Sequence, residues 1–318
     1  MVCHPFHKTA CKTSGFVRQN ATECAFATSD SWVILTPIEQ SIKRKIEAVG
    51  TPLKDWDIKI NRGILTGCNE AFIIDEEKRQ ELIAQDPRSA EIIRPILRGR
   101  DIKRYGYNYA GLYLIATFPA RHYDIEQYPA VKHYLLSYDK ERLLEAGIDD
   151  IANNAALLTD FCRQRLEQSG KDIIINGHKV IIDGKAQKAR KKTGNKWFET
   201  QDQIGYWEDF SKPKIVWGNL SLKAAFTKAP GTMFVSAPCV MITPYSDYLL
   251  AILNSKLADW YIRQLGVTRN GGYFEYKPMF VEQLPIPQTR KTVSTDADVY
   301  RIYGLTSNEI AFIETVCC

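Results

Sequence analysis

The order of the short apolar runs limits the fold of this chain more than any other feature. Several runs have the length and β-branched composition of strands: residues 112–118, 214–217 and 233–243, and the pair 173–175 and 180–182, which flanks a hairpin turn. A doubly wound parallel sheet requires strands that alternate regularly with helices. That alternation is missing here, so we expect an α+β fold of mixed, mostly antiparallel strands.

Helical periodicity is clearest between residues 248 and 265, where apolar residues recur every three or four positions. This pattern predicts one long amphipathic helix near the C-terminus. Thr306 and Glu309 have the spacing of a capping box and predict the start of a final helix. The segment 56–74 predicts two strands around a glycine-bearing turn. Weaker helical patterns cover residues 38–49, 76–85, 89–96, 128–144 and 307–316.

The composition is that of an ordinary globular protein, with 45% hydrophobic and 25% charged residues in 318. No run approaches the roughly 20 apolar residues that cross a bilayer, and the first 30 residues lack the apolar core of a signal peptide. We therefore expect a cytoplasmic protein without a membrane partner. Cys3, His4, His7 and Cys11 lie close together, but without a second cluster they do not predict a zinc site.

Basic residues are unevenly distributed, although the formal net charge is only +5. Two runs lead into aromatic segments, at residues 94–104 and 185–196. Cations interleaved with flat side chains suit phosphate contacts and base stacking, whereas an isolated charge run is usually a solvated face. The candidate phosphate contacts are Arg98, Arg100, Lys103, Arg104, Lys191, Lys192 and Lys196.

Other polar and aromatic residues are candidates for reading base edges. Asn195, Trp197 and Gln201 lie beside the second basic run, and amides pair well with adenine. Further candidates lie around glycine-bearing turns, namely Asn219, Arg269, Asn270 and Lys277. Two other residues fit structural roles better. Trp217 follows two β-branched residues in a strand and is expected in the core, and Asn254, near the middle of an apolar helix, is expected to cap or brace a neighbouring loop.

Recognisable catalytic motifs are absent from the sequence. There is no dinucleotide or phosphate loop, no nucleophile elbow and no Asn-Pro-Pro-Tyr. Asp55, Asp57 and Lys59 could form a metal-nuclease triplet on one strand, but such short triplets are common by chance. We therefore predict no catalytic residue and no metal ligand in this chain.

Several stretches, in order, resemble the C-terminal specificity region of type IIG restriction-modification enzymes and Taq-type adenine-N6 DNA methyltransferases. The last two stretches below also resemble the specificity subunits of type I systems. The quoted stretches are 32–40 (WVILTPIEQ), 61–72 (NRGILTGCNEAF), 93–105 (IRPILRGRDIKRY), 212–217 (KPKIVW), 249–256 (LLAILNSK) and 283–287 (QLPIP). The resemblance extends over residues 31–316.

This resemblance implies a target-recognition domain that contacts double-stranded DNA beside a methylation site. It divides the chain into a poorly ordered segment (1–30), the DNA target-recognition domain (31–287) and a linker with a short C-terminal helix (288–318). S-adenosylmethionine, and Mg²⁺ for a nuclease, are expected only on catalytic domains that this chain lacks. The chain would then be a separate piece, a fragment or a frameshifted product. Two alternatives stay open: a specificity subunit that acts in trans with a methyltransferase, and a small metal-dependent nuclease. An exposed apolar patch is expected where a catalytic domain would dock.

Overall fold

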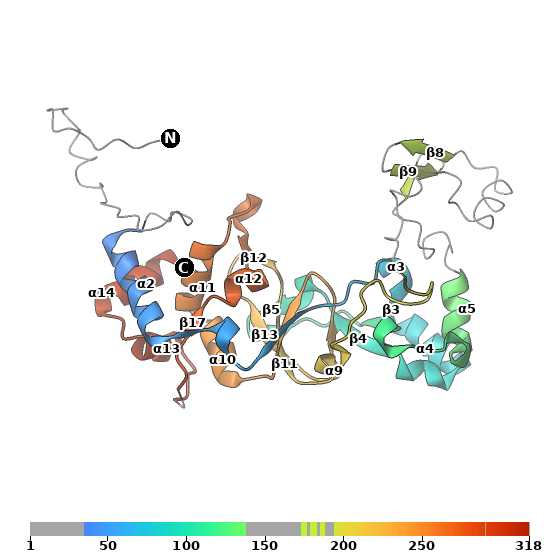
Figure 1. The fold of residues 1–318 in the computed structure, drawn as a ribbon, viewed down its shortest axis with the longest axis horizontal. Coiled ribbons are helices and arrows are strands. Elements are labelled where there is room, and N and C mark those ends of the chain that lie inside the picture. The colour runs from blue at the N-terminus through green and yellow to red at the C-terminus, as the bar shows by residue number, and fades with distance from the viewer. Residues whose placement is uncertain are drawn as a thin grey trace.

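The computed structural model describes residues 35–137, 173–176, 179–182, 185–187, 194–289 and 291–317. The N-terminal segment with its cysteines and histidines, and the candidates Lys191 and Lys192, lie outside these residues. The described part is elongated (Figure 1), with most helices gathered at its two ends and strands between them.

A four-stranded antiparallel sheet forms the middle of the molecule, in the order β13-β11-β15-β2. Its strands are β2 (Lys59–Arg62), β11 (Lys214–Trp217), β13 (Phe226–Ala229) and β15 (Val240–Thr243). Alternate residues along a strand point to opposite faces of the sheet, and both faces of this sheet are covered. Ile215 and Trp217 belong to one hydrophobic core, whereas Val216 belongs to the other. The same sheet therefore joins two cores.

The first core lies under a second sheet of order β14-β4-β7-β3. Its strands are β3 (Ile73–Asp75), β4 (Ile93–Leu97), β7 (Leu112–Ile115) and β14 (Phe234–Val235), and only β14–β4 is parallel. The helices at this end are α3 (Asn69–Phe72), α4 (Glu76–Gln85), α5 (Pro129–Ser137) and α9 (Trp207–Phe210). The helix predicted at 89–96 is wrong, because Pro95 cannot continue a helix and the segment pairs with β7 instead.

The second core is covered mainly by helices. They are α2 (Pro37–Val49), α10 (Asp247–Leu253), α11 (Lys256–Leu265), α12 (Pro278–Val281), α13 (Asp296–Ile302) and α14 (Ser307–Val316). The single long helix predicted for 248–265 is two helices. Asn254 ends α10, and Ser255 starts α11 by accepting a hydrogen bond from the Ala258 amide at 3.1 Å. The capping box of α14 is present as predicted.

The first and last described segments pack against each other. Glu309 of α14 accepts hydrogen bonds from Ser41 at 2.8 Å and Lys45 at 2.6 Å, both on α2. Strand β1 (Thr51–Pro52) pairs with β17 (Pro285–Ile286) beside them. The region predicted as a linker with one helix holds both α13 and α14, and Val299 and Ile313 are buried in the second core.

Three small antiparallel units complete the fold. They are β5 (Ile102–Lys103) with β6 (Gly106–Tyr107), β12 (Leu220–Ser221) with β16 (Phe274–Glu275), and the hairpin of β8 (Ile173–Asn176), β9 (Lys179–Ile182) and β10 (Lys185–Gln187). The β8–β9 hairpin is confirmed, whereas the two strands predicted within 56–74, β2 and β3, belong to different sheets. These pairings confirm an α+β fold of mostly antiparallel strands.

Candidate functional site

The first basic stretch forms a tight loop around β5 and β6. Arg98 binds Asp101 through two hydrogen bonds, Nε to Oδ2 at 3.0 Å and an η-nitrogen to Oδ1 at 2.9 Å. Burial alone would raise the pKa of Asp101, but the hydrogen bonds and charge of Arg98 lower it. Arg98 is thus held inside the loop, whereas Arg100 and Lys103 are exposed on its outside.

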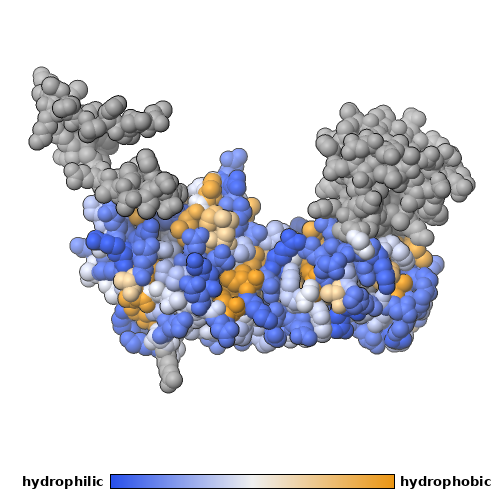
Figure 2. All heavy atoms as spheres, in the orientation of Figure 1, coloured by the Kyte–Doolittle hydropathy of each residue, from blue (hydrophilic) through white to orange (hydrophobic). Residues whose placement is uncertain are grey.

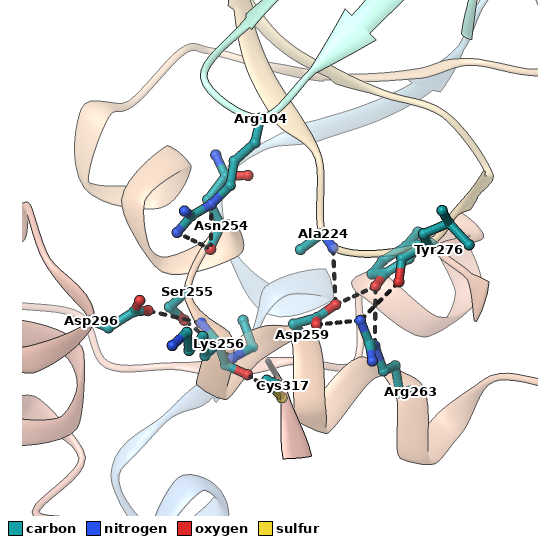
Figure 3. Close-up of polar contacts among 12 residues, drawn as sticks. Arg104, Ala224, Asn254, Ser255, Lys256, Asp259, Arg263, Tyr276, Asp296 and Cys317 are labelled. Carbon is teal, nitrogen blue, oxygen red and sulfur yellow. Dashed lines mark hydrogen bonds and ion pairs between the residues drawn. The ribbon is translucent and has the colours of Figure 1, made fainter. Parts of the chain in front are cut away.

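Arg104 and Tyr105 attach this basic loop to the second core. The Arg104 guanidinium donates to the carbonyl oxygen of Asn254 at 2.9 and 3.2 Å (Figure 3). The Tyr105 amide donates to the carbonyl of Phe226 at 3.0 Å, and the Tyr105 ring lies 5.0 Å from the Arg104 guanidinium carbon. Arg104 therefore positions the loop, although its side chain is also partly open to solvent.

Asn254 fixes the point at which the basic loop is attached. Its side-chain amide pairs with the backbone of Phe226 like a neighbouring strand, accepting from N–H and donating to C=O, both at 2.9 Å. Only 2% of Asn254 is exposed. The prediction that Asn254 braces a neighbouring segment is confirmed.

Asp259 on α11 organises the neighbouring loops (Figure 3). Its buried carboxylate accepts from the Ala224 amide at 2.9 Å and from the Tyr276 hydroxyl, and pairs with Arg263 at 2.6 Å. Burial, followed by the charge of Asp259, raises the pKa of Tyr276, so this hydroxyl stays a donor. Arg263 also donates to the Leu222 carbonyl at 3.0 Å. One helix thereby holds the segments that carry β12 and β16.

We define the ribbon as residues 219–223 and 267–277, which contain β12 and β16. Four predicted base-edge candidates meet in it: Asn219, Arg269, Asn270 and Lys277. At its base, buried Glu275 accepts from Arg269 Nε at 2.6 Å and lies 3.1 Å from Lys277 Nζ. These two hydrogen-bonded cations lower the pKa of Glu275. Two positive side chains therefore flank one buried negative charge.

The ribbon and the basic loop lie side by side. A β-carbon built at Gly218 would be 3.8 Å from the Gly99 α-carbon, so the backbones of the two segments nearly touch. The Tyr276 amide donates to the Asn219 carbonyl at 2.8 Å, and Trp217, buried as predicted, donates Nε1 to the Tyr276 carbonyl at 2.7 Å. We call the joined area the basic surface, and its cations are Arg100, Lys103, Arg104, Arg269 and Lys277.

The candidates around residue 195 do not belong to the basic surface. Asn195 is buried, donates to the carbonyls of Thr200 at 3.0 Å and Gln201 at 2.9 Å, and accepts from Gln203 at 2.6 Å. Its amide is thus used within its own loop, and the base contact of Asn195 stays a prediction that these hydrogen bonds do not favour. Trp197 is half-buried against the first core, and Lys196 is exposed, with its Nζ 5.6 Å from the Phe198 ring centre.

The residues of the nuclease alternative are not arranged as predicted. Asp55 ends a single 3-10 turn and Asp57 lies in a bend, so only Lys59 is on a strand. Lys59 Nζ lies 3.9 Å from buried Asp209. Within the described ranges, no group of three or more His, Cys, Asp or Glu side chains could hold a metal ion. We assign no metal-dependent step to these residues.

The apolar members of the ribbon were not among the predicted site residues. Leu220, Leu222 and Tyr273 are exposed beside its cations. The Leu-Ser-Leu alternation at 220–222 was a usable signal, because it places both leucines on one face of an extended segment.

None of the helices that the structure describes has the length and apolarity needed to cross a membrane.

A family model described as the TaqI-like C-terminal specificity domain matches residues 94–286. No curated protein matches the chain. Two solved structures are similar at 12% identity. One is the type IIL restriction-modification enzyme MmeI in complex with DNA (TM-score 0.43), with 72% of this chain and 25% of that one covered. The other is the type IIG restriction endonuclease BpuSI (TM-score 0.48), with 89% and 32% covered. The chain thus spans between a quarter and a third of these proteins.

Proposed function

Because this chain belongs to the family of TaqI-like C-terminal specificity domains, we propose that it recognises a defined sequence in double-stranded DNA for a restriction-modification enzyme. The observation that carries the proposal is the basic surface, where two cation-bearing segments more than 100 residues apart in sequence meet at Gly99 and Gly218. Arg100 and Lys103 are exposed there and suit phosphate contacts, which position a protein on a duplex. The ribbon beside them offers side chains for reading bases.

The proposal is tested by the salt dependence of duplex binding. Each phosphate contact contributes about 0.9 to the slope of log affinity against log salt concentration. Replacing Arg100→Gln and Lys103→Gln together is expected to reduce that slope by about 2. The matched control is Lys43→Gln on α2, a lysine 39% exposed and paired with Glu47, which is expected to leave the slope unchanged. Equal slopes for the double variant and the unchanged chain would exclude the basic loop from the interface.

We further infer that the parent enzyme is an adenine-N6 DNA methyltransferase with an endonuclease, as the resemblance of the sequence motifs implies. S-adenosylmethionine and Mg²⁺ would bind to its other domains, and this chain would perform only the recognition step, in the cytoplasm. A methyltransferase domain or separate subunit is the expected protein partner. Co-purification of the chain with such a subunit, and restoration of DNA methylation on mixing the two, would support this proposal.

A further inference from the structure

The ribbon projects from the body of the protein. Between α11 and α12 the chain rises beside β12 (Figure 1). The Arg269 amide donates to the Tyr273 carbonyl at 2.7 Å and closes the turn. Gly271 and Gly272 both have φ of +77°, a conformation that few other residues adopt without strain. The tip is therefore a narrow turn on a stem formed by a two-stranded hairpin, in which Thr268 pairs with Phe274, and by β12, which adds a third strand beside β16 at the base.

One face of this stem is apolar and exposed. Leu220 is 53% exposed, Leu222 52% and Tyr273 44%. A β-carbon at Gly272 would lie 4.0 Å from Leu222 Cδ2, so Leu222 reaches the turn. Hydrophobic atoms are visible on this projection in the space-filling view (Figure 2). Clustered apolar side chains on a projecting element indicate a binding surface.

The opposite face is held against the protein body. Phe274 lies under Arg263, whose guanidinium carbon is 4.0 Å from the ring centre. Arg263 is in turn paired with buried Asp259, and the base of the ribbon is held by buried Glu275. The ribbon is thus fixed before it meets a partner, which reduces the entropy cost of binding.

Charge and position indicate which partner the apolar face meets. Arg269 and Lys277 flank the stem, Lys223 is exposed beside Leu222, and the one carboxylate of the ribbon, that of Glu275, is buried and paired. Gly218, the residue before the ribbon, also lies against Gly99 of the basic loop, whose Arg100 and Lys103 are exposed. These cations favour a polyanion as partner over a protein surface with few acidic residues. We take the partner to be the same duplex DNA as in the proposed function.

The DNA major groove is about 12 Å wide and admits a two-stranded β-ribbon, which is the form of the hairpin that carries the tip. The apolar group that bases present in that groove is the C5-methyl of thymine. We propose that the ribbon enters the major groove and that Leu220, Leu222 and Tyr273 contact thymine methyl groups, so that this face selects T·A pairs. The inference rests on the proposed function and adds the recognising element and the recognised chemical group.

The test removes the methyl group from DNA and the apolar group from the protein. Duplexes are selected from a randomised pool with the full chain, and each thymine of the selected duplex is then replaced by deoxyuridine. At one or more positions we expect binding to weaken about fourfold, the effect of losing one buried methyl-sized group. In Leu222→Ala or Leu220→Ala the same replacement should have no effect at the position that each leucine contacts.

Val316→Ala on α14 is the matched control, because Val316 is 45% exposed but lies outside the ribbon, and it should keep the full deoxyuridine effect. The inference would be overturned, and the proposed function left intact, if replacing thymine by deoxyuridine leaves the affinity of the selected duplex unchanged at every position. The inference would also be overturned if both leucine variants lose as much affinity on deoxyuridine replacement as the unchanged chain does. It would likewise be overturned if the two variants differ from that chain only in self-association. If no duplex is selected at all, the proposed function itself fails.

Discussion

Asn254 allows the clearest energetic test of how the basic loop is supported. Replacement by Leu keeps the branching and the number of side-chain heavy atoms but removes both side-chain hydrogen bonds. The N–H of Phe226 is then buried without a partner, whereas its C=O still accepts from the Tyr105 amide. An unsatisfied buried polar group costs about 1–3 kcal/mol, so the free energy of unfolding should fall by about that amount. Asn254→Asp should not restore it, because a carboxylate accepts from the N–H but cannot donate to the C=O.

Denaturant-induced unfolding measures this loss directly. Asn270→Leu is the matched control, since Asn270 lies exposed in the turn of the ribbon, and it should change the free energy of unfolding by less than about 0.5 kcal/mol. A loss below about 1 kcal/mol for Asn254→Leu would refute the reasoning. It would mean that Phe226 is not held by this amide and that the carbonyl bound by Arg104 is not fixed in place.

Three more changes test other parts of the structure. Burial would raise the pKa of Glu309, but hydrogen bonds, led by that of Lys45, lower the pKa to about 2. The ionised Glu309 therefore stabilises the fold above pH 4.5, and this stabilisation is lost as the pH falls through 2. Glu309→Gln should therefore cost up to about 3 kcal/mol at pH 7, with the difference from the unchanged chain shrinking in acid unfolding curves below pH 4.5. Lys214 is buried, and its ammonium donates to three carbonyls at 2.8–3.0 Å. Lys214→Met should therefore lower the free energy of unfolding by about 2–4 kcal/mol, measured by urea unfolding. Asn195→Ala should lower the melting temperature yet leave duplex affinity of the folded chain within about twofold, and a selective loss of affinity would support its base-contact role.

Elements with local signals could be predicted from the sequence. The capping box at Thr306 and Glu309 predicted the start of α14, and the helix predicted at 76–85 has the bounds of α4. Such signals depend on neighbours in the chain, so they need no knowledge of the tertiary structure. The Ser255 cap that divides α10 from α11 was a signal of the same kind, and the apolar periodicity around it concealed it.

Elements that depend on distant partners could not be predicted. Residues 89–96 have apolar residues near helical spacing, yet β4 forms because β7 and β14 provide strand partners on both sides. The C-terminal segment packs into the second core through contacts such as Lys45 to Glu309, which are 264 residues apart. No periodicity within the segment indicates that pairing.

The candidate site was predictable in composition and only partly in arrangement. The basic run at 98–104 was identified, but the sequence could not show that Asp101 holds Arg98 while Arg100 and Lys103 are exposed. The approach of Gly218 to Gly99, which joins the two halves of the basic surface, is a tertiary contact. Likewise, Asn195 has the residue type of a base reader and the burial of a structural residue.

Sequence-specific binding is the central claim, and a competition assay with the full chain tests it most directly. A labelled duplex selected from a randomised pool is displaced by the same duplex unlabelled or by a scrambled duplex of equal length and composition, at about 150 mM salt. Specific DNA binding exceeds non-specific binding by about 10³-fold or more. We predict that the selected duplex competes at least about 100-fold better than the scrambled one. Equal competition by the two duplexes, or no binding to either, would contradict the account.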